Sequence, residues 1–489
     1  MRTVDMPPDA ATLMWSTRAI GYTTPAAVAD LIDNSISANA SRISIQFLSG
    51  EKSYVSILDD GDGMEADELR LAMRYGSGSP WKEREANDLG RFGLGLKTAS
   101  LSQCRRLTVI SKKIGVVSAY CWDLDHVITA GRWDLIELDE DEIRDLPQFD
   151  SLSCMSEGTI VLWEKLDKIF AGDVDKEKGL LLKIKEIEEH LSLIFHRYLQ
   201  GEPGLKKLTI ESNGIALKPN DPFYVNRSDE LPSERIIVKY EDSHGQIMDG
   251  VVVVTPYILP FSDTMTQEEL AALGGKEGLI KNQGFYIYRN KRLIVAADWF
   301  RVARKTDLSK LCRVKVDMPN TLDDIWTIDV KKSMAIPPEV VLKNLRRIVT
   351  PIIKAGKRKY RFRATKEVAS DHVQLWVSRE TRNGVVYNVN PEYPILKDLM
   401  AEVHDTRKMQ TFIRLLEQNI PVNAIHTDFS DDRKFAFEDL DEAYQNILNN
   451  LRDLLRDIPP DQREEEFNEL MEIMPFAEYD IQFSDLGEI

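Results

Sequence analysis

The chain has 489 residues and a net charge of −17, with 43% hydrophobic and 29% charged residues. This composition excludes a wholly disordered chain, and the length corresponds to about three domains. No apolar run approaches the roughly 18 residues of a membrane span, and the N-terminus lacks a signal-peptide pattern. The four cysteines have no CxxC spacing, which argues against a zinc site or a disulfide framework. We therefore expect a cytosolic protein that does not engage a membrane.

The charge is unevenly distributed. Residues 428–489 contain 19 acidic and 5 basic residues, so −14 of the net −17 lies in this stretch. Residues 343–366 contain ten Lys or Arg and no Asp or Glu. The overall acidity therefore does not exclude a polyanionic partner.

The first third of the sequence alternates between helix and strand patterns. A helix is predicted over 24–39, because Pro25 suits a first helical turn and apolar residues recur at helical spacing. The other predicted elements are strands over 43–47, 53–58, 106–111, 116–122 and 158–166, a helix over 66–75 and a helix beginning within 94–101. This order predicts an α+β layer, with helices covering one face of a sheet.

A second, strand-rich region begins near residue 205 and includes one helical segment at 266–275. From Pro337 a long helix is predicted to run into the basic segment, with a kink or break at Pro351. The sequence after about residue 371 reads as helical and ends in the acidic stretch. We predict three parts: 1–200, 201–356, and 357–489 with the basic linker, a helical region and the acidic C-terminal tail.

Polar residues interrupt the apolar pattern of the helix over 24–39. Asp30, Asp33 and Asn34 stand at positions i, i+3 and i+4, so they project from one face. Taken alone, this pattern also fits a solvated polar face.

Three further motifs follow. The sequence DDGDG at 59–63 is a tight turn after a strand, and Gly158-Thr159 opens an apolar strand. The glycine-rich stretch GRFGLGLKT at 90–98 runs into a helix, and its backbone N–H groups with Lys97 suit a polyphosphate. Each motif is weak evidence by itself.

Together, in this order and spacing, the four motifs resemble the ATP-binding signature of the GHKL superfamily of gyrases, heat-shock chaperones, histidine kinases and MutL proteins. The resemblance covers about residues 10–165 and implies a Bergerat-type ATP-binding α/β sandwich with ATP and Mg²⁺ as ligands. No GxxxxGK[ST] motif occurs, so the site is not of the Walker A type.

The resemblance implies a role for each residue of the motifs. Asp30 stands at the position of the general base for the attacking water, and Asn34 at that of the Mg²⁺ ligand. Asp59 corresponds to the carboxylate that accepts the adenine amino group, beside Gly61, Gly63 and Met64, and Thr159 supports it. The phosphate-binding residues are Gly90, Gly93, Gly95, Lys97 and Thr98, with residues 75–80 as part of the same cover.

The sequence departs from the family pattern at the base. Most members have Glu there, and the shorter Asp30 leaves the water farther away, which predicts slow hydrolysis. Asp33 is a rival for the base. Ser37 stands where the MutL-like pattern has Asp, which we interpret as tolerated.

The branch of the superfamily is indicated by the second region. Only some ten residues precede the part of the chain that the resemblance covers, which argues against a histidine kinase, and no MutL endonuclease motif occurs. The hairpin pattern at 283–294 resembles the transducer domain, and with the sequence WTIDVKKSMAIPP it is most similar to prokaryotic MORC-like ATPases. The resemblance implies that Lys332, or alternatively Lys331, contacts the γ-phosphate. A lysine pair at the end of a surface strand remains the alternative.

These features predict a Mg-ATP-dependent ATPase whose heads form a homodimeric clamp on DNA or on a DNA-processing partner. The partner would be a nuclease, helicase or other protein of a restriction or antiphage defence system, a role that only the resemblance implies. The candidate nucleic-acid contacts are Lys354, Lys357, Arg358, Lys359, Arg361 and Arg363. Two alternatives remain open for this basic segment. It binds the chain's own acidic tail or the dimer mate, or it has no partner. The rival function is a chaperone-like or scaffolding protein that closes on a protein client with little hydrolysis.

Overall fold

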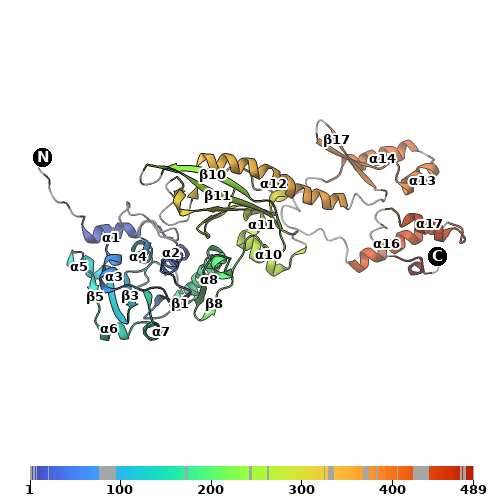
Figure 1. The fold of residues 1–489 in the computed structure, drawn as a ribbon. Coiled ribbons are helices and arrows are strands. Elements are labelled where there is room, and N and C mark those ends of the chain that lie inside the picture. The colour runs from blue at the N-terminus through green and yellow to red at the C-terminus, as the bar shows by residue number, and fades with distance from the viewer. Residues whose placement is uncertain are drawn as a thin grey trace. The chain divides into compact units, whose positions relative to one another are not determined.

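The computed structural model describes residues 3–487, except 4–5, 7, 20, 76–94, 171–174, 242–244, 262–263, 324, 329–334, 367–372, 374, 382–383, 405, 422–439, 457, 474–475 and 477–480. The chain divides into two compact units, Met1–Gly356 and Lys357–Ile489 (Figure 1). Within the described residues, no helix combines the length and apolarity that crossing a bilayer requires.

The first unit begins with an eight-stranded sheet in the order β5-β4-β3-β6-β2-β1-β7-β8. Its strands are β1 (Arg42–Leu48), β2 (Tyr54–Asp59), β3 (Arg106–Lys113), β4 (Val116–Asp123), β5 (Ile136–Glu137), β6 (Gly158–Glu164), β7 (Thr209–Ser212) and β8 (Ile215–Ala216). The helices of this part are α1 (Ala10–Arg18), α2 (Thr24–Ser37), α3 (Ala66–Met73), α4 (Gly95–Leu101), α5 (Leu124–Ala130), α6 (Glu140–Arg144), α7 (Phe149–Cys154), α8 (Lys176–Ile194) and α9 (His196–Gln200). The predicted α+β class is confirmed.

One pairing in this sheet differs from the sequence analysis. Strand β7 lies parallel to β1, with Arg42 opposite Thr209 and Ile45 opposite Ser212. The strands at 209–216, which the sequence pattern assigned to the second region, therefore complete the first sheet. The connection from β6 to β7 runs through the helices α8 and α9.

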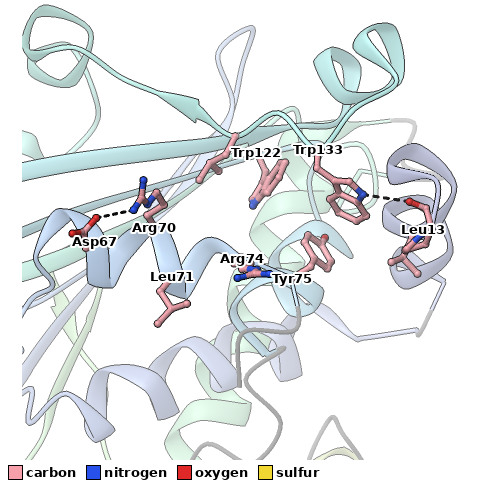
Figure 2. Close-up of a pocket in the computed structure, with 10 residues that line it drawn as sticks. Leu13, Asp67, Arg70, Leu71, Arg74, Tyr75, Trp122 and Trp133 are labelled. Atoms are coloured by element: carbon pink, nitrogen blue, oxygen red, sulfur yellow. Dashed lines mark hydrogen bonds and ion pairs between the residues drawn. The ribbon is translucent and has the colours of Figure 1, made fainter. Parts of the chain in front are cut away.

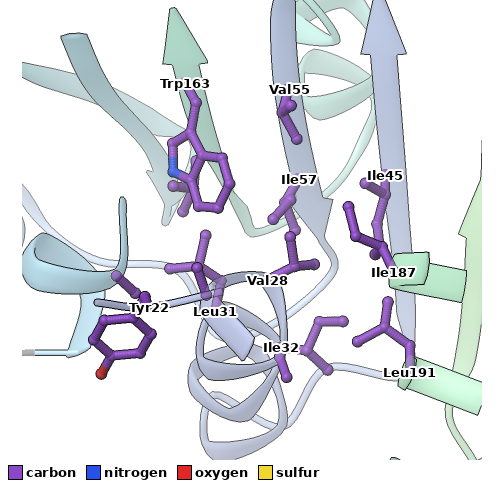
Figure 3. Close-up of a cluster of buried hydrophobic side chains, with 14 of the residues drawn as sticks. Tyr22, Val28, Leu31, Ile32, Ile45, Val55, Ile57, Trp163, Ile187 and Leu191 are labelled. Carbon is purple, nitrogen blue, oxygen red and sulfur yellow. The ribbon is translucent and has the colours of Figure 1, made fainter. Parts of the chain in front are cut away.

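Helix α2 is held by its apolar face. The Thr23 side chain caps its N-terminus by accepting from the Ala26 N–H, and Pro25 occupies the first turn. The core residues around the helix, shown in Figure 3, are Val28, Leu31, Ile32, Ile45, Val55, Ile57, Trp163, Ile187 and Leu191. Burial of each aliphatic side chain contributes about 1.5–3 kcal/mol, which fixes the helix against the sheet.

A second sheet follows in the order β10-β11-β14-β12-β13, with β9 paired to β11. Its strands are β9 (Asp229–Glu230), β10 (Glu234–Glu241), β11 (Ile247–Ile258), β12 (Gly284–Arg289), β13 (Arg292–Asp298) and β14 (Cys312–Met318). The shorter elements beside it are α10 (Gln267–Gly274), η2 (Gly275–Glu277), α11 (Gly278–Lys281), η3 (Asp307–Ser309), η4 (Asn320–Leu322), β15 (Thr327–Ile328) and β16 (Ala335–Ile336). Strands β12 and β13 form the hairpin expected at 283–294, and positive φ angles at Asn290 (46°) and Lys291 (69°) make its two-residue turn.

The helix predicted from Pro337 is α12 (Glu339–Lys366). The helix runs along the second sheet (Figure 1). Its apolar side chains, including Leu345 and Ile352, are buried in the core of that sheet. The expected break at Pro351 does not occur, because the helix continues through that residue. Packing on the sheet offsets the hydrogen bond that the proline removes.

The second unit is not wholly helical, contrary to the expectation for residues after 371. Strands β17 (Trp376–Thr381) and β18 (Gly384–Val389) form an antiparallel hairpin, because alternating Val-rich segments favour a strand. The helices are α13 (Pro394–Glu402), α14 (Thr406–Gln418), α16 (Leu440–Leu455) and α17 (Arg463–Leu470), followed by η6 (Phe483–Leu486). The acidic stretch contains a core of its own, in which Leu451 and Leu455 are fully buried.

Candidate nucleotide site around helix α2

The two acids of α2 are buried. Asp30 is 3% exposed and Asp33 is 0% exposed, whereas Asn34, one residue farther along, is exposed. A solvated polar face therefore does not explain the acids. Buried carboxylates need partners, and both have them.

Asp30 lies close to two segments that flank α2. The hydroxyl of Tyr22 donates a hydrogen bond to Asp30 Oδ2 at 2.9 Å. A Cβ placed on Gly95, at the start of α4, would lie 3.6 Å from the same oxygen. The structure thus brings the predicted base next to Gly95, one of the predicted phosphate-binding residues.

Asp59 is buried at the end of β2 and is held by neutral donors. The Ser35 hydroxyl of α2 donates to Asp59 Oδ2 at 2.6 Å, and the Gly61 N–H donates to Oδ1 at 3.0 Å. Burial raises the pKa of Asp59 above its ordinary value, and these two hydrogen bonds act against that shift. Helix α2 therefore contacts Asp59 through Ser35 while it carries Asp30.

The glycines of the DDGDG turn are required by the protein's own packing. A Cβ on Gly61 would lie 2.7 Å from the Ala38 carbonyl oxygen, and one on Gly63 would collide with the Lys112 carbonyl. Gly63 also has a φ of +61°. The turn is thus fixed against α2 and β3 before any ligand binds.

Thr159 stands opposite Asp59 on the neighbouring strand β6. Its hydroxyl lies 2.8 Å from the hydroxyl of Ser111, and Ser111 Oγ accepts the Met64 N–H at 2.8 Å. The side-chain donor to Asp59 is therefore Ser35, while Thr159 joins the chain of hydroxyls that fixes Met64.

Lys97 and Thr98 of α4 are both buried, at 1% and 2% exposure. The Lys97 ammonium donates to the Ala72 carbonyl of α3 at 2.7 Å, and burial lowers the pKa of Lys97 to about 8.

Several predicted residues lie outside the described part of the chain. These are Gly90 and Gly93, residues 76–80 of the proposed cover, and the lysine pair Lys331 and Lys332. In the basic segment, Lys354 is exposed on α12. The structure does not describe the side chains of Lys357, Arg358, Lys359, Arg361 and Arg363.

Sequence reasoning missed three residues of the site. Ser35 directly follows Asn34 and lies one helical turn beyond Leu31. Its place on the apolar face of the helix, which packs on the sheet, was the local signal that could have identified it. Tyr22 gave no such signal. Arg292 was noted only as part of the basic hairpin, yet its Nε donates to Asp33 Oδ1 at 3.1 Å.

A cavity of about 890 Å³ lies away from these residues, next to α3 (Figure 2). Tyr75, Trp122 and Trp133 form its aromatic wall, with ring centroids 5.4 to 6.2 Å apart. Arg70 and Asp67, which are paired at 2.9 Å, line it as well. Tyr75, the first residue of the predicted cover, lines this cavity, and the other predicted site residues that the structure describes are not among its lining residues.

Residues 22–159 match the family model described as "Histidine kinase-, DNA gyrase B-, and HSP90-like ATPase". Similar curated proteins include "ATPase morc-1" of Caenorhabditis elegans, 32% identical over 94 residues, which are 19% of this chain and 11% of that protein. "DNA mismatch repair protein MutL" of Dictyoglomus turgidum is 25% identical over 229 residues, 41% of this chain and 40% of that protein. The match thus spans less than half the length of either relative.

A solved structure titled "Crystal Structure of N terminal domain of a DNA repair protein" is 16% identical, with a TM-score of 0.40. The similarity covers 74% of this chain and 100% of that one.

Proposed function

Since residues 22–159 form a GHKL-type ATPase domain with MORC and MutL proteins among its relatives, we propose that this chain binds Mg-ATP and hydrolyses it slowly. The observation that carries the proposal is the gathering of Asp30, Asn34 and the Ser35-held Asp59 around α2. ATP binding closes a homodimeric clamp on DNA or on a DNA-processing partner, in the cytosol.

Asp59 selects adenine. Its carboxylate accepts a hydrogen bond from the exocyclic amino group, which adenine has at this position and guanine lacks. Met64 packs on the base, and Gly61 and Gly63 supply backbone at the bottom of the pocket. Asp59 is well placed for this role because neutral donors occupy both its oxygens without cancelling its charge.

Asp30 orients and deprotonates the water that attacks the γ-phosphate. The Tyr22 hydroxyl fixes the carboxylate from one side, and the absence of a side chain at Gly95 leaves room on the other. Because Asp is one methylene shorter than the Glu of most relatives, the water lies farther from the base and turnover is slow. Lys332, or alternatively Lys331, supplies positive charge at the γ-phosphate.

A magnesium ion fits at Asn34. Among the described residues, no group of three or more His, Cys, Asp or Glu side chains is arranged to hold a metal. The exposed Asn34 amide offers one oxygen ligand, which suits an ion that takes its other ligands from phosphate and water. When bound, the ion neutralises charge on the phosphates.

The basic half of α12 is the proposed DNA contact. Reversal of Lys357, Arg358 and Lys359 to Glu should weaken duplex DNA binding by about tenfold or more and make it less steeply dependent on salt. The measurement is a binding titration at several salt concentrations, with ATPase stimulation by DNA as a second readout.

A matched control reverses Lys185, Lys207 and Lys239, which are exposed and lie elsewhere in the first unit. It changes the net charge equally and should leave DNA binding within about twofold. Equal losses in both triple variants would show that only net charge matters, and no loss in either would place the DNA site elsewhere.

A second candidate function, closure on a protein client with little hydrolysis, is favoured by one observation. The second unit exposes large apolar side chains, among them Tyr387 (54%), Phe412 (56%) and Leu415 (51%). Exposed apolar surface of this kind is typical of protein contacts. ATPase activity that responds to DNA argues for the clamp, and activity that responds only to unfolded protein argues for the client-binding function.

A further inference from the structure

We propose that Arg292, on strand β13 of the second sheet, is a positioning residue for ATP hydrolysis. It holds Asp33, and with it the segment of α2 that carries Asp30, in the geometry that turnover requires. The inference rests on the proposed ATPase function and adds that the second sheet contributes a residue to the hydrolytic end of the site.

The contact joins three buried charged side chains. Arg292 Nε donates to Asp33 Oδ1 at 3.1 Å, and Arg292 Nη2 lies 4.0 Å from Asp30 Oδ1. The side chains of Arg292 and Asp30 are each 3% exposed, and that of Asp33 is fully buried. Because Asp30 and Asp33 stand at i and i+3, one guanidinium can face both carboxylates.

The guanidinium is itself fixed. Arg292 Nη1 donates to the Leu293 carbonyl at 3.1 Å, and the guanidinium carbon lies 5.9 Å from the centre of the Phe195 ring. The imidazole of His190 on α8 also faces this group, and its pKa is lowered to about 4, first by burial and then by the positive charge of Arg292. His190 is therefore neutral at pH 7 and does not compete for the acids.

Other contacts dock the hairpin independently of Arg292. Tyr198 of α9 donates its hydroxyl to the Asn290 carbonyl at 2.7 Å, and His196 Nε2 lies 2.7 Å from the Tyr288 hydroxyl. Arg197 pairs with Asp317 of β14. Loss of the Arg292 side chain should therefore leave the second sheet in place and remove only its charged contacts with the two acids of α2.

The effect on turnover follows from geometry. Removal of one member of a buried ion pair leaves the other charge uncompensated, so Asp33 and its part of α2 should shift from their positions. A displacement of about 1 Å at a catalytic group costs up to about a hundredfold in rate. ATP binding should be affected much less, because Asp59 contacts α2 through Ser35, outside this ion-pair group.

The chain offers a matched control in Arg289, at the other side of the same hairpin turn. Arg289 is 2% exposed and pairs with Asp323, with Nε–Oδ1 and Nη2–Oδ2 distances of 2.8 and 2.7 Å. This ion pair is as buried as that of Arg292. Its acid, Asp323, directly follows the short helix η4 and is not part of α2. Arg289→Gln thus reproduces the loss of a buried pair without touching Asp33.

The experiment compares full-length Arg292→Gln, Arg292→Lys and Arg289→Gln with the unchanged protein. Steady-state kinetics give kcat and KM for ATP, and hydrogen exchange without nucleotide reports the protection of α2. We expect Arg292→Gln to lower kcat by about tenfold or more with KM within about threefold, and to speed exchange in α2 by about tenfold. Arg292→Lys should recover part of kcat, because it restores the charge but not the fork of donors. Arg289→Gln should change kcat and α2 exchange by less than about twofold, even if its melting temperature falls as far.

Two results overturn the inference while leaving the ATPase proposal intact. One is an unchanged kcat in Arg292→Gln, and the other is an equal loss of kcat in Arg292→Gln and Arg289→Gln, which indicates general destabilisation. If the unchanged protein binds ATP but does not hydrolyse it, the ATPase proposal fails, and the positioning role fails with it.

Discussion

The two ends of the candidate site treat buried carboxylates differently. Asp59 is supported by a hydroxyl and a backbone N–H, both from the first domain. Asp33 is supported by a guanidinium that comes from the second sheet, 259 positions later in the chain. The contacts of the carboxylate assigned to adenine thus come from residues of the first sheet and its helices. The end assigned to hydrolysis includes a residue of the second sheet.

This difference has an electrostatic consequence. The pKa of Asp59 stays raised, because its neutral hydrogen-bond donors only partly oppose the effect of burial. A full positive charge at the other end compensates the acids directly, and it comes from strand β13 of the second sheet. Nucleotide recognition and hydrolysis should therefore respond to different perturbations.

The largest expected effect separates hydrolysis from binding. Asp30→Asn should lower kcat by about 10²- to 10⁴-fold, because the amide cannot accept the proton of the attacking water. The affinity for ATP should stay within a few-fold, so an ATP-bound dimer should accumulate in gel filtration. Asp67→Asn, at an 89% exposed side chain, is the control with the same charge change. Normal turnover by Asp30→Asn would refute the base assignment and favour Asp33.

The next effect concerns the adenine end. Asp59→Asn should weaken ATP binding by about 10- to 100-fold or abolish it, because the amide replaces an acceptor with a donor. Equilibrium dialysis measures this directly. Asp60→Asn is the neighbouring control, since Asp60 accepts from the Ser41 and Arg42 amides and has no contact with α2 among the described interactions. Equal losses in the two variants would contradict a specific adenine contact.

The smallest effect is a pH dependence. The pKa of Asp59 is raised by burial, so its carboxylate protonates, and ATP affinity declines, at a higher pH than the value of about 4 for an ordinary aspartate. Stability without nucleotide has the opposite sign: it falls as pH rises through the same window, because the folded state holds the proton more tightly.

Ser35→Ala removes a hydrogen bond that lowers the pKa of Asp59. The decline in ATP affinity should therefore begin at a higher pH in this variant, and within that pH range its affinity should be several-fold weaker than that of the unchanged protein. Binding titrations between pH 5 and 8 on both proteins test this, since titration of the nucleotide phosphates is common to the two. Superimposable profiles would show that Asp59 does not contact the base as its carboxylate.

The sequence predicted the local elements of the site well. The helix expected over 24–39 ends at Ser37, and the strand before DDGDG ends at Asp59 as expected. These elements depend on short-range signals such as a Pro in the first turn, helical spacing and paired glycines. Taken alone, the pattern of Asp30 and Asp33 also fitted a solvated polar face, and their interpretation as site residues depended on the four motifs together.

What the sequence did not predict depends on distant partners. The pattern of residues 209–216 is that of any short strand, so nothing local indicated a parallel pairing with β1. The basic run at the 283–294 hairpin is typical of an exposed tip, yet Arg289 and Arg292 are buried with acids far along the chain. In the second unit, the sequence that follows β18 is strongly amphipathic at helical spacing, and the whole region was therefore predicted to be helical. The short alternating segments that form β17 and β18 were missed.

The pairing of β7 with β1 also determines how the ATPase part can be isolated. Through β7, the main-chain N–H and C=O groups on one side of β1 are satisfied by residues that follow α8 and α9. A fragment ending at residue 200 would leave that edge open, and an open, apolar strand edge recruits other chains. The smallest autonomous piece therefore extends past β8, because β7, which follows α8 and α9, covers the open side of β1.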